Sequence, residues 1–450
     1  MPFRKDFVWG AAAASYQVEG GHDADGKGPS VWDAFCRWPG KTHLGQTGDV
    51  ACDHYHRYAE DVALMKQVGL KGYRLSLSWP RILPDGTGAV NEKGLAFYDR
   101  LVDALLAAGI QPWVTLFHWD LPLALHHRGG WLNREIVEWF GEYTRVVVER
   151  LGDRVRHWMT LNEPQVFILH GYGNGVHAPG LVLSLKDQLL GVHHVLMSHG
   201  RAVQVIRQRA KAATTVGWAP VGAVRVPASG SPADVQAARV ATTTVTEKSL
   251  WGNAWFGDPV VLGGYPESGL QVFGHIAPKA QPGDMELMKQ PLDFYGMNNY
   301  TGLEVRAGAD GRAEEVPPPP GRPITAYYWP VTPASHYWGP KFLSERYRLP
   351  IVVTENGMAC CDWVATDGAV HDPQRIDFMR RYLRELRRAA DEGVDIRGYF
   401  HWSVMDNFEW AEGFKQRFGM IHVDFATQKR TLKDSALWYA QTIRANGTNL

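Results

Sequence analysis

The chain is poor in cysteine and carries no excess charge of either sign. Its four cysteines among 450 residues, Cys36, Cys52, Cys360 and Cys361, lack the Cys-x-x-Cys spacing of a structural zinc site. Lysine and arginine together number 47, as do aspartate and glutamate, so the formal net charge is zero. Because binding to nucleic acid requires a basic surface, nucleic acid is not an expected partner.

Long apolar runs and a signal peptide are also missing. No apolar stretch is long enough to span a membrane, so no membrane partner is expected. Residues 1–5 lead directly into a strand-like run, which favours a cytoplasmic protein. The sequence contains neither His-Glu-x-x-His nor a facial triad, so we expect no metal and no other cofactor.

Aromatic residues, by contrast, are abundant. The chain contains 18 tryptophans and 17 tyrosines. Some of these belong to a hydrophobic core, but Trp and Tyr also stack on the flat apolar faces of ligands. Sugar rings have such faces.

Apolar or β-branched runs recur along the chain, each followed by a segment with helical periodicity. This alternation predicts an α/β fold, a single (β/α)8 TIM barrel in which residues 1–450 form one catalytic domain. Segment 301–335, with prolines at 317–320, is expected to form a loop at the pocket rim. The last helix is expected at 432–445, with Leu437 on its apolar face. The expected strands are residues 7–15, 72–79, 111–119, 156–163, 214–222, 293–300, 350–355 and 396–403.

Polar and aromatic residues occupy the predicted strand ends, where the active site of such a barrel forms. Seven of the eight strands contribute one; the residues are Gln17, Arg74, His118 with Trp119, Asn162 with Glu163, Tyr300, Glu355 and Trp402. Each has an ordinary explanation when taken alone, such as a core histidine for His118 or a solvated surface cation for Arg74. The position of Arg74 within a strand nevertheless predicts that it pairs with a carboxylate. Their joint placement predicts a polar pocket with aromatic walls.

Two of these residues are glutamates that end apolar, strand-like runs. Glu163 lies in Thr160-Leu161-Asn162-Glu163-Pro164, and Glu355 lies in Thr354-Glu355-Asn356-Gly357. A charge at the end of a buried strand usually has a partner or a chemical role. Two carboxylates on separate strand ends are what an enzyme needs to cleave a glycosidic bond.

These motifs, together with His401–Trp410, resemble those of family 1 glycoside hydrolases of the β-glucosidase type, and the likeness extends from Phe7 to Phe425. It implies a retaining enzyme that removes terminal β-D-glucosyl residues from aryl β-glucosides, cellobiose and short cello-oligosaccharides. Glu163 would be the acid/base and Glu355 the nucleophile. Retention implies that their carboxyl groups lie about 5–5.5 Å apart.

The resemblance also implies which residues support the reaction. Arg74 and Tyr300 would support the nucleophile, and Glu409 would disfavour a 6-phosphorylated sugar through charge repulsion. Trp329 matches the tryptophan platform for the leaving group, although the residues around it depart from the family pattern. The residues implied to bind substrate are Gln17, His118, Trp119, Asn162, Asn298, Trp329, Trp402, Glu409, Trp410 and Phe418.

Two other functions remain alternatives. One is a broad-specificity β-glycosidase that accepts galactosides or fucosides. The other is a non-catalytic sugar-binding barrel, which the presence of Glu163, Glu355 and Arg74 disfavours. The expected partners are small-molecule β-glucosides and oligosaccharides, and the oligomeric state stays open, a homo-oligomer included.

Overall fold

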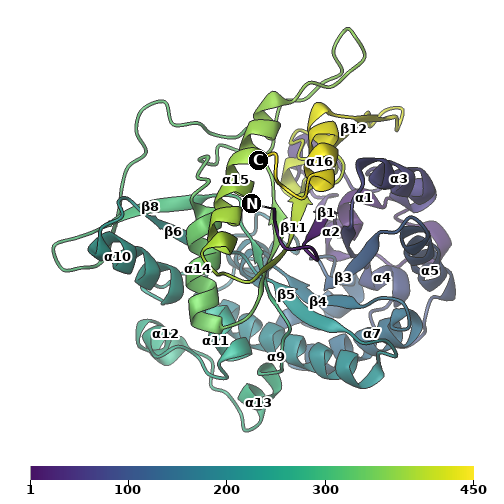
Figure 1. The fold of residues 1–450 in the computed structure, drawn as a ribbon. Helices are drawn as coiled ribbons and strands as arrows, with labels where there is room; N and C mark the ends of the chain where they lie inside the picture. The colour runs from purple at the N-terminus through teal and green to yellow at the C-terminus, as the bar shows by residue number, and fades with distance from the viewer. Residues whose placement is uncertain (1) are drawn as a thin grey trace.

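The structure, a computed structural model, describes residues 2–450, and its centre is a barrel of parallel strands surrounded by helices (Figure 1). Eight strands form one sheet in the order β5-β4-β3-β2-β1-β11-β10-β7. Every neighbouring pair in this sheet is parallel, which confirms the predicted barrel. The strands are β1 (Val8–Ala12), β2 (Gly72–Ser76), β3 (Gln111–Phe117), β4 (His157–Asn162), β5 (Thr215–Ala219), β7 (Tyr295–Asn298), β10 (Ile351–Asn356) and β11 (Ile396–Trp402).

The barrel closes between β5 and β7, and fewer backbone hydrogen bonds join these two strands than join the other neighbouring strands. The N–H of Asp293 donates to the carbonyl of Val216 at 2.9 Å, and the N–H of Asn298 donates to the carbonyl of Pro220 at 3.0 Å. A parallel bridge between Val221 and Asn298 completes the junction. Pro220 has no N–H to donate, so regular pairing cannot continue past the end of β5.

Helices cover the outside of the barrel, and the strands are therefore buried on both faces. In β2 and β10 every residue is buried, including the charged Arg74 and Glu355. The longer helices are α3 (His54–Val68), α5 (Glu92–Ala107), α7 (Ile136–Leu151), α9 (Leu185–Arg209), α10 (Pro232–Thr243), α14 (Ser335–Tyr347), α15 (Pro373–Asp391) and α16 (Asp434–Arg444). The shorter ones are α1 (Ser15–Val18), α2 (Val31–Phe35), α4 (Trp79–Ile82), α6 (Leu123–His127), α8 (Pro164–Ile168), α11 (Ala254–Val261), α12 (Glu267–Phe273) and α13 (Asp284–Met288).

Several predicted boundaries are wrong at the active-site end. The first two strands end at Ala12 and Ser76, and the apolar runs then continue into the buried short helices α1 and α4. A short apolar run does not by itself distinguish a buried strand from a buried helix. The prediction that Leu437 lies on the apolar face of the last helix is also wrong, because this residue is 50% exposed.

Segment 301–335 forms a small sheet and a loop outside the barrel. Strand β8 (Gly302–Ala307) pairs in parallel with β6 (Val224–Pro227) and antiparallel with β9 (Ala313–Glu315). The proline run at 317–320 lies near the surface, and the chain then returns to the barrel mouth. A further hairpin pairs β12 (Ile421–Val423) with β13 (Arg430–Leu432).

Candidate active site

A cavity of about 340 Å³ opens at the C-terminal ends of the barrel strands. Arg74, Asn162 and Gln17 do not line it and lie behind its wall, where they are fully buried. The other residues expected at the site all line the cavity; they are His118, Trp119, Glu163, Asn298, Tyr300, Trp329, Glu355, Trp402, Glu409, Trp410 and Phe418.

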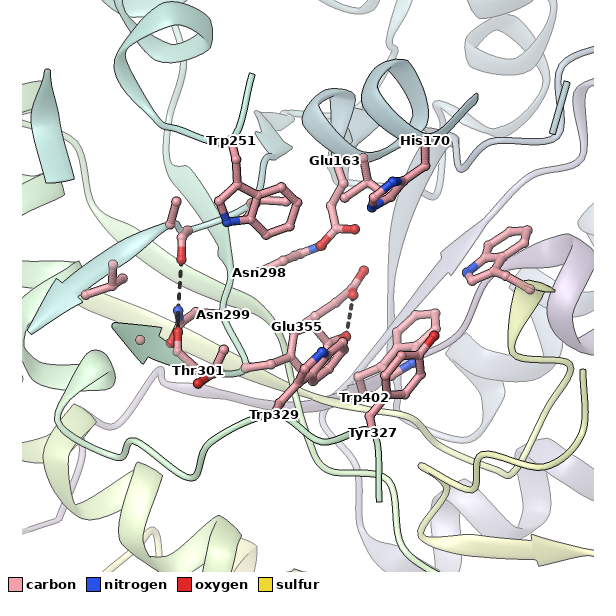
Figure 2. Close-up of a pocket in the computed structure, with 18 of the residues that line it drawn as sticks. Glu163, His170, Trp251, Asn298, Asn299, Thr301, Tyr327, Trp329, Glu355 and Trp402 are labelled. Carbon is pink, nitrogen blue, oxygen red and sulfur yellow. Dashed lines mark hydrogen bonds between the residues drawn. The ribbon is translucent and has the colours of Figure 1, made fainter. Parts of the chain in front are cut away.

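The carboxyl groups of Glu163 and Glu355 are turned toward each other across this cavity (Figure 2). Glu355 lies within β10, whereas Glu163 directly follows β4 and precedes Pro164, the first residue of α8. The backbone of Glu163 has φ 45° and ψ 64°, in the left-handed region that is uncommon for residues other than glycine. Its N–H donates to the carbonyl of Ala219 at 2.8 Å, which ties this turn to β5.

Both carboxylate oxygens of Glu355 accept hydrogen bonds from buried donors. Arg74 forms an ion pair with Oε1, and the hydroxyl of Tyr300 donates to Oε2 at 2.6 Å. Burial and the charge of Glu355 raise the pKa of Tyr300 well above its ordinary value, so the phenol keeps its proton. A guanidinium and a phenol thus occupy the two oxygens of this carboxyl group.

Glu163 lies in a different environment. It is 8% exposed and accepts one hydrogen bond, from Nδ2 of Asn298 at 3.0 Å. Burial raises its pKa well above the ordinary value, and the negative charge of Glu355 raises it further. Glu163 therefore favours its protonated form, whereas Glu355 is contacted by a guanidinium and a hydroxyl donor.

A hydrogen-bond network behind the cavity links four strands. Oδ1 of Asn162 accepts from Nη2 of Arg74 at 2.5 Å and from Nδ2 of Asn298 at 2.9 Å, while Oγ1 of Thr354 donates to Oδ1 of Asn298 at 2.6 Å. Nδ2 of Asn162 lies 2.9 Å from Nε2 of His118. Burial, together with the charge of Arg74, lowers the pKa of His118 well below its ordinary value, so its neutral ring accepts this hydrogen bond.

Glu409 forms the other acidic end of the cavity. Burial raises its pKa to about 8, and the charge of Glu355 adds to the effect. Nε2 of Gln17 lies 3.2 Å from Glu409, and it also faces Oδ1 of Asn407 at 3.0 Å and the carbonyl of Phe408 at 2.8 Å. Three acceptors therefore share the two N–H groups of one amide, which places Gln17 as a support for Glu409 rather than on the cavity surface.

Tryptophan and tyrosine rings form the walls. The rings of Trp119 and Trp410 are 4.5 Å apart, and Tyr327 stacks on Trp329 at 4.5 Å. Trp119 and Trp410 have φ values of 79° and 51°, and such strained backbone conformations concentrate at functional sites. Two ring pairs, one tilted and one stacked, thus present flat apolar surfaces to the cavity.

The sequence interpretation missed several cavity residues because they do not follow barrel strands. They are His170, His177, Arg225, Trp251 and Tyr327. Trp251 precedes α11 and is 42% exposed, and Tyr327 belongs to the loop after β9. No local sequence pattern distinguishes Trp251, which lies between Leu250 and Gly252.

Residues 2–450 contain neither a metal-binding cluster nor a helix that could span a membrane. Within them, no group of three or more His, Cys, Asp or Glu side chains is placed to hold a metal ion. None of the helices formed by these residues has the length and apolar character needed to cross a membrane.

Comparison with known proteins places the chain among characterised relatives. It is 44% identical to β-glucosidase A of Thermotoga maritima over 99% of this chain and 98% of the relative. It is also 42% identical to a β-glucosidase of Agrobacterium sp. over 97% of this chain and 94% of the relative.

Solved structures agree with the sequence comparison. The family 1 β-glucosidase from Thermotoga maritima superposes with a TM-score of 0.91 at 44% identity, covering 99% of both chains. The same values hold for the Thermotoga maritima β-glucosidase in complex with glucoimidazole. The sequence pattern of the family described as Glycosyl hydrolase family 1 matches residues 1–448. The chain belongs to this family and is a glycoside hydrolase.

Proposed function

We propose that the protein is a retaining β-glucosidase. Its substrates would be aryl β-glucosides, cellobiose and short cello-oligosaccharides, from which it removes the terminal non-reducing β-D-glucosyl residue. The observation that carries the proposal is the pair Glu163 and Glu355, which face one cavity in opposite electrostatic environments. The names of the relatives, among them β-glucosidases and a 1,4-β-D-glucan glucohydrolase of Thermotoga neapolitana, support it.

In the first step Glu355 attacks the anomeric carbon of the sugar. Glu163 donates its proton to the glycosidic oxygen as the bond from that oxygen to the anomeric carbon breaks. The aglycone leaves as a neutral alcohol, and Glu355 becomes the ester of a glycosyl-enzyme. The raised pKa of Glu163 keeps the required proton available near neutral pH.

In the second step Glu163 acts as a base. Esterification removes the negative charge of Glu355, which is one cause of the raised pKa of Glu163. The pKa of Glu163 therefore falls in the intermediate, and the carboxylate takes a proton from water as the water oxygen attacks the anomeric carbon. The ester bond breaks, Glu355 is released, and the product keeps the β configuration.

The remaining cavity residues would bind the glucosyl ring. Hydrogen bonds donated by the ring hydroxyls would favour the ionised form of Glu409, and each such charge-assisted bond is worth about 1.5–3 kcal/mol. Trp402 would supply an apolar surface for the ring, with His118 and Trp410 beside it. A phosphorylated sugar would place a second negative charge near Glu409 and is therefore disfavoured.

The proposal is tested with the variant Glu355→Ala. We expect it to lose hydrolysis of 4-nitrophenyl β-D-glucoside while the protein stays folded, and azide to restore turnover with α-glucosyl azide as product. Full activity in this variant would remove Glu355 from the mechanism. A panel of nitrophenyl glucosides, galactosides and fucosides separates the β-glucosidase from the broader β-glycosidase.

A further inference from the structure

The cavity is chemically divided into two parts. Its acidic residues, Glu163, Glu355 and Glu409, belong to the part that would hold the glucosyl ring. In Figure 2, Trp251 and Trp329 lie on opposite sides of the two catalytic carboxylates, above and below them in this view. Beside these acids the cavity lining contains apolar side chains, Val166, Val221, Val224, Trp251, Leu303 and Trp329, and the polar side chains of His170, Asn299 and Thr301.

The apolar side chains favour an aromatic ring over a second sugar as leaving group. A glucose unit at this position carries hydroxyl groups on every side, and each hydroxyl that loses water without a new partner costs free energy. A flat apolar ring, by contrast, gains from leaving water and from stacking on Trp251 or Trp329. The lining therefore favours an aromatic aglycone.

One charged side chain interrupts this apolar wall. Arg225 lies on β6, is half-buried, and is the only lysine or arginine within residues 2–450 that lines the cavity. Its N–H donates to Oγ1 of Thr242 at 3.0 Å, and its Cα pairs with that of Leu303 on β8. The backbone of Arg225 is thus fixed by a strand on one side and a helix on the other.

The guanidinium of Arg225 has no ion-pair or hydrogen-bond partner in the described part of the chain. Glu304, on the neighbouring strand, is paired with Arg322 at 3.5 Å. Glu247 lines a small adjoining cavity that Arg225 and Trp251 also line, but it lies beyond ion-pair distance. A half-buried guanidinium beside apolar side chains is only partly hydrated, so an anion that enters the cavity would bind to it strongly.

We propose that the leaving-group side of the cavity selects aromatic aglycones that carry a carboxylate, and that Arg225 is the specificity residue that binds the carboxylate. This inference rests on the proposed β-glucosidase function. The planar guanidinium can donate two parallel hydrogen bonds to a carboxylate, while Trp251 and Leu303 contact the ring.

The test uses two aryl glucosides of similar shape, 4-carboxyphenyl and 4-carbamoylphenyl β-D-glucoside, and repeats the comparison with the 3-substituted pair. The variant Arg225→Gln removes the charge, and Arg312→Gln is the matched control, because Arg312 is 89% exposed on the β8–β9 turn of the same small sheet. The ratio of variant to wild-type kcat/KM for each substrate cancels the difference in leaving-group reactivity between the two phenols.

We expect Arg225→Gln to lower kcat/KM about tenfold or more on the better carboxylate substrate, mainly through KM, and less than about twofold on the matching amide. Arg312→Gln should change neither. In the wild type, 0.5 M NaCl should reduce the preference for the carboxylate, because salt screens a partly exposed charge pair. Arg225→Lys should keep part of the preference.

Equal losses on carboxylate and amide, or no loss on either, would overturn the proposal. If Arg225→Gln does not fold, two other measurements decide: the effect of salt on the wild-type preference, and the ratio of kcat/KM on the carboxylate to that on the amide in Arg225→Lys. A preference that salt does not reduce and that Arg225→Lys does not change would overturn the proposal. Hydrolysis of the neutral 4-nitrophenyl β-D-glucoside by the wild type is measured in parallel. If the wild type does not hydrolyse this substrate, the proposed β-glucosidase function is wrong. If it hydrolyses the substrate but shows no preference for the carboxylate aglycones, only the proposed role of Arg225 is wrong.

Discussion

The hydroxyl of Tyr300 donates a 2.6 Å hydrogen bond to Oε2 of Glu355, while Arg74 holds the other oxygen. Each oxygen that could attack the sugar is therefore already engaged. The hydrogen bond orients the carboxylate for the attack that the proposed mechanism requires.

Tyr300→Phe removes this donor without changing the ring. We expect kcat to fall about 10- to 100-fold, since a hydrogen bond to a charged group is worth about 1.5–3 kcal/mol. Single-turnover measurement of glycosyl-enzyme formation tests this. Tyr327→Phe is the matched control, because Tyr327 lines the same cavity but stacks on Trp329 instead of contacting Glu355, and it should keep at least about half the rate.

The loss of activity in Glu163→Ala should depend on the leaving group of the substrate. Cellobiose needs a proton on the departing oxygen, so its kcat/KM should fall at least about 100-fold, within the range for general acid catalysis. With 2,4-dinitrophenyl β-D-glucoside, which needs no proton, the burst of dinitrophenol should persist, and slow deglycosylation should be accelerated by azide. Equal losses on both substrates would contradict an acid role for Glu163.

The buried acids of the cavity should make the protein less stable as pH rises. The folded-state pKa of Glu409 is raised to about 8, and that of Glu163 is also raised, so above pH 4.5 these two carboxyl groups bind more protons in the folded protein than in the unfolded chain. The contribution of Glu409 to stability therefore falls between about pH 4.5 and pH 8. Glu409→Gln should stabilise the protein at pH 8.5 by at least about 1.4 kcal/mol, the equivalent of one pKa unit, and give no gain at pH 4.

Calorimetric melting at pH 4, 6.5 and 8.5 measures this difference. The control is Glu412→Gln, which removes a neighbouring carboxylate that pairs with Lys415 at the surface. An equal change in Tm for Glu409→Gln at all three pH values would show that its effect is not due to titration.

The loop that carries Glu409 should depend on a buried ion-pair network. Asp406 accepts hydrogen bonds from Nζ of Lys433 at 2.7 Å, from Arg417 at 2.6 Å and from the N–H of Gly419 at 3.0 Å. Asp406→Ala leaves two cations without this partner and should destabilise the protein by about 3–5 kcal/mol. Its effect on Tm should far exceed that of Glu412→Gln, because surface pairs contribute about 0–1 kcal/mol.

The same Asp406 variant should also change substrate binding. Asp406 connects the segment before Glu409 to the segment that holds Phe418, so its loss should raise KM for 4-nitrophenyl β-D-glucoside at a temperature where the variant is still folded. An unchanged KM in a strongly destabilised variant would limit the network to stability.

Much of the site was predictable because parallel strands end at one edge of a barrel. Glu163 follows β4 and Glu355 lies next to the last residue of β10, so the fold class places them together. Arg74 lies in the middle of β2, and its expected pairing with a carboxylate is present. The boundaries failed where apolar runs continue past Ala12 and Ser76 into buried helices, since apolar character is common to both structures.

The sequence by itself determined the eight strands, the family and the order in which polar residues reach the barrel edge. Only the tertiary structure decided the unequal environments of Glu163 and Glu355, the place of Gln17 behind Glu409, and the free guanidinium of Arg225. The physical reason is that hydration and electrostatic partners depend on which loops meet in space. Trp251 and Arg225 come from connections whose paths no local pattern specifies, whereas strand ends are brought together by the barrel itself.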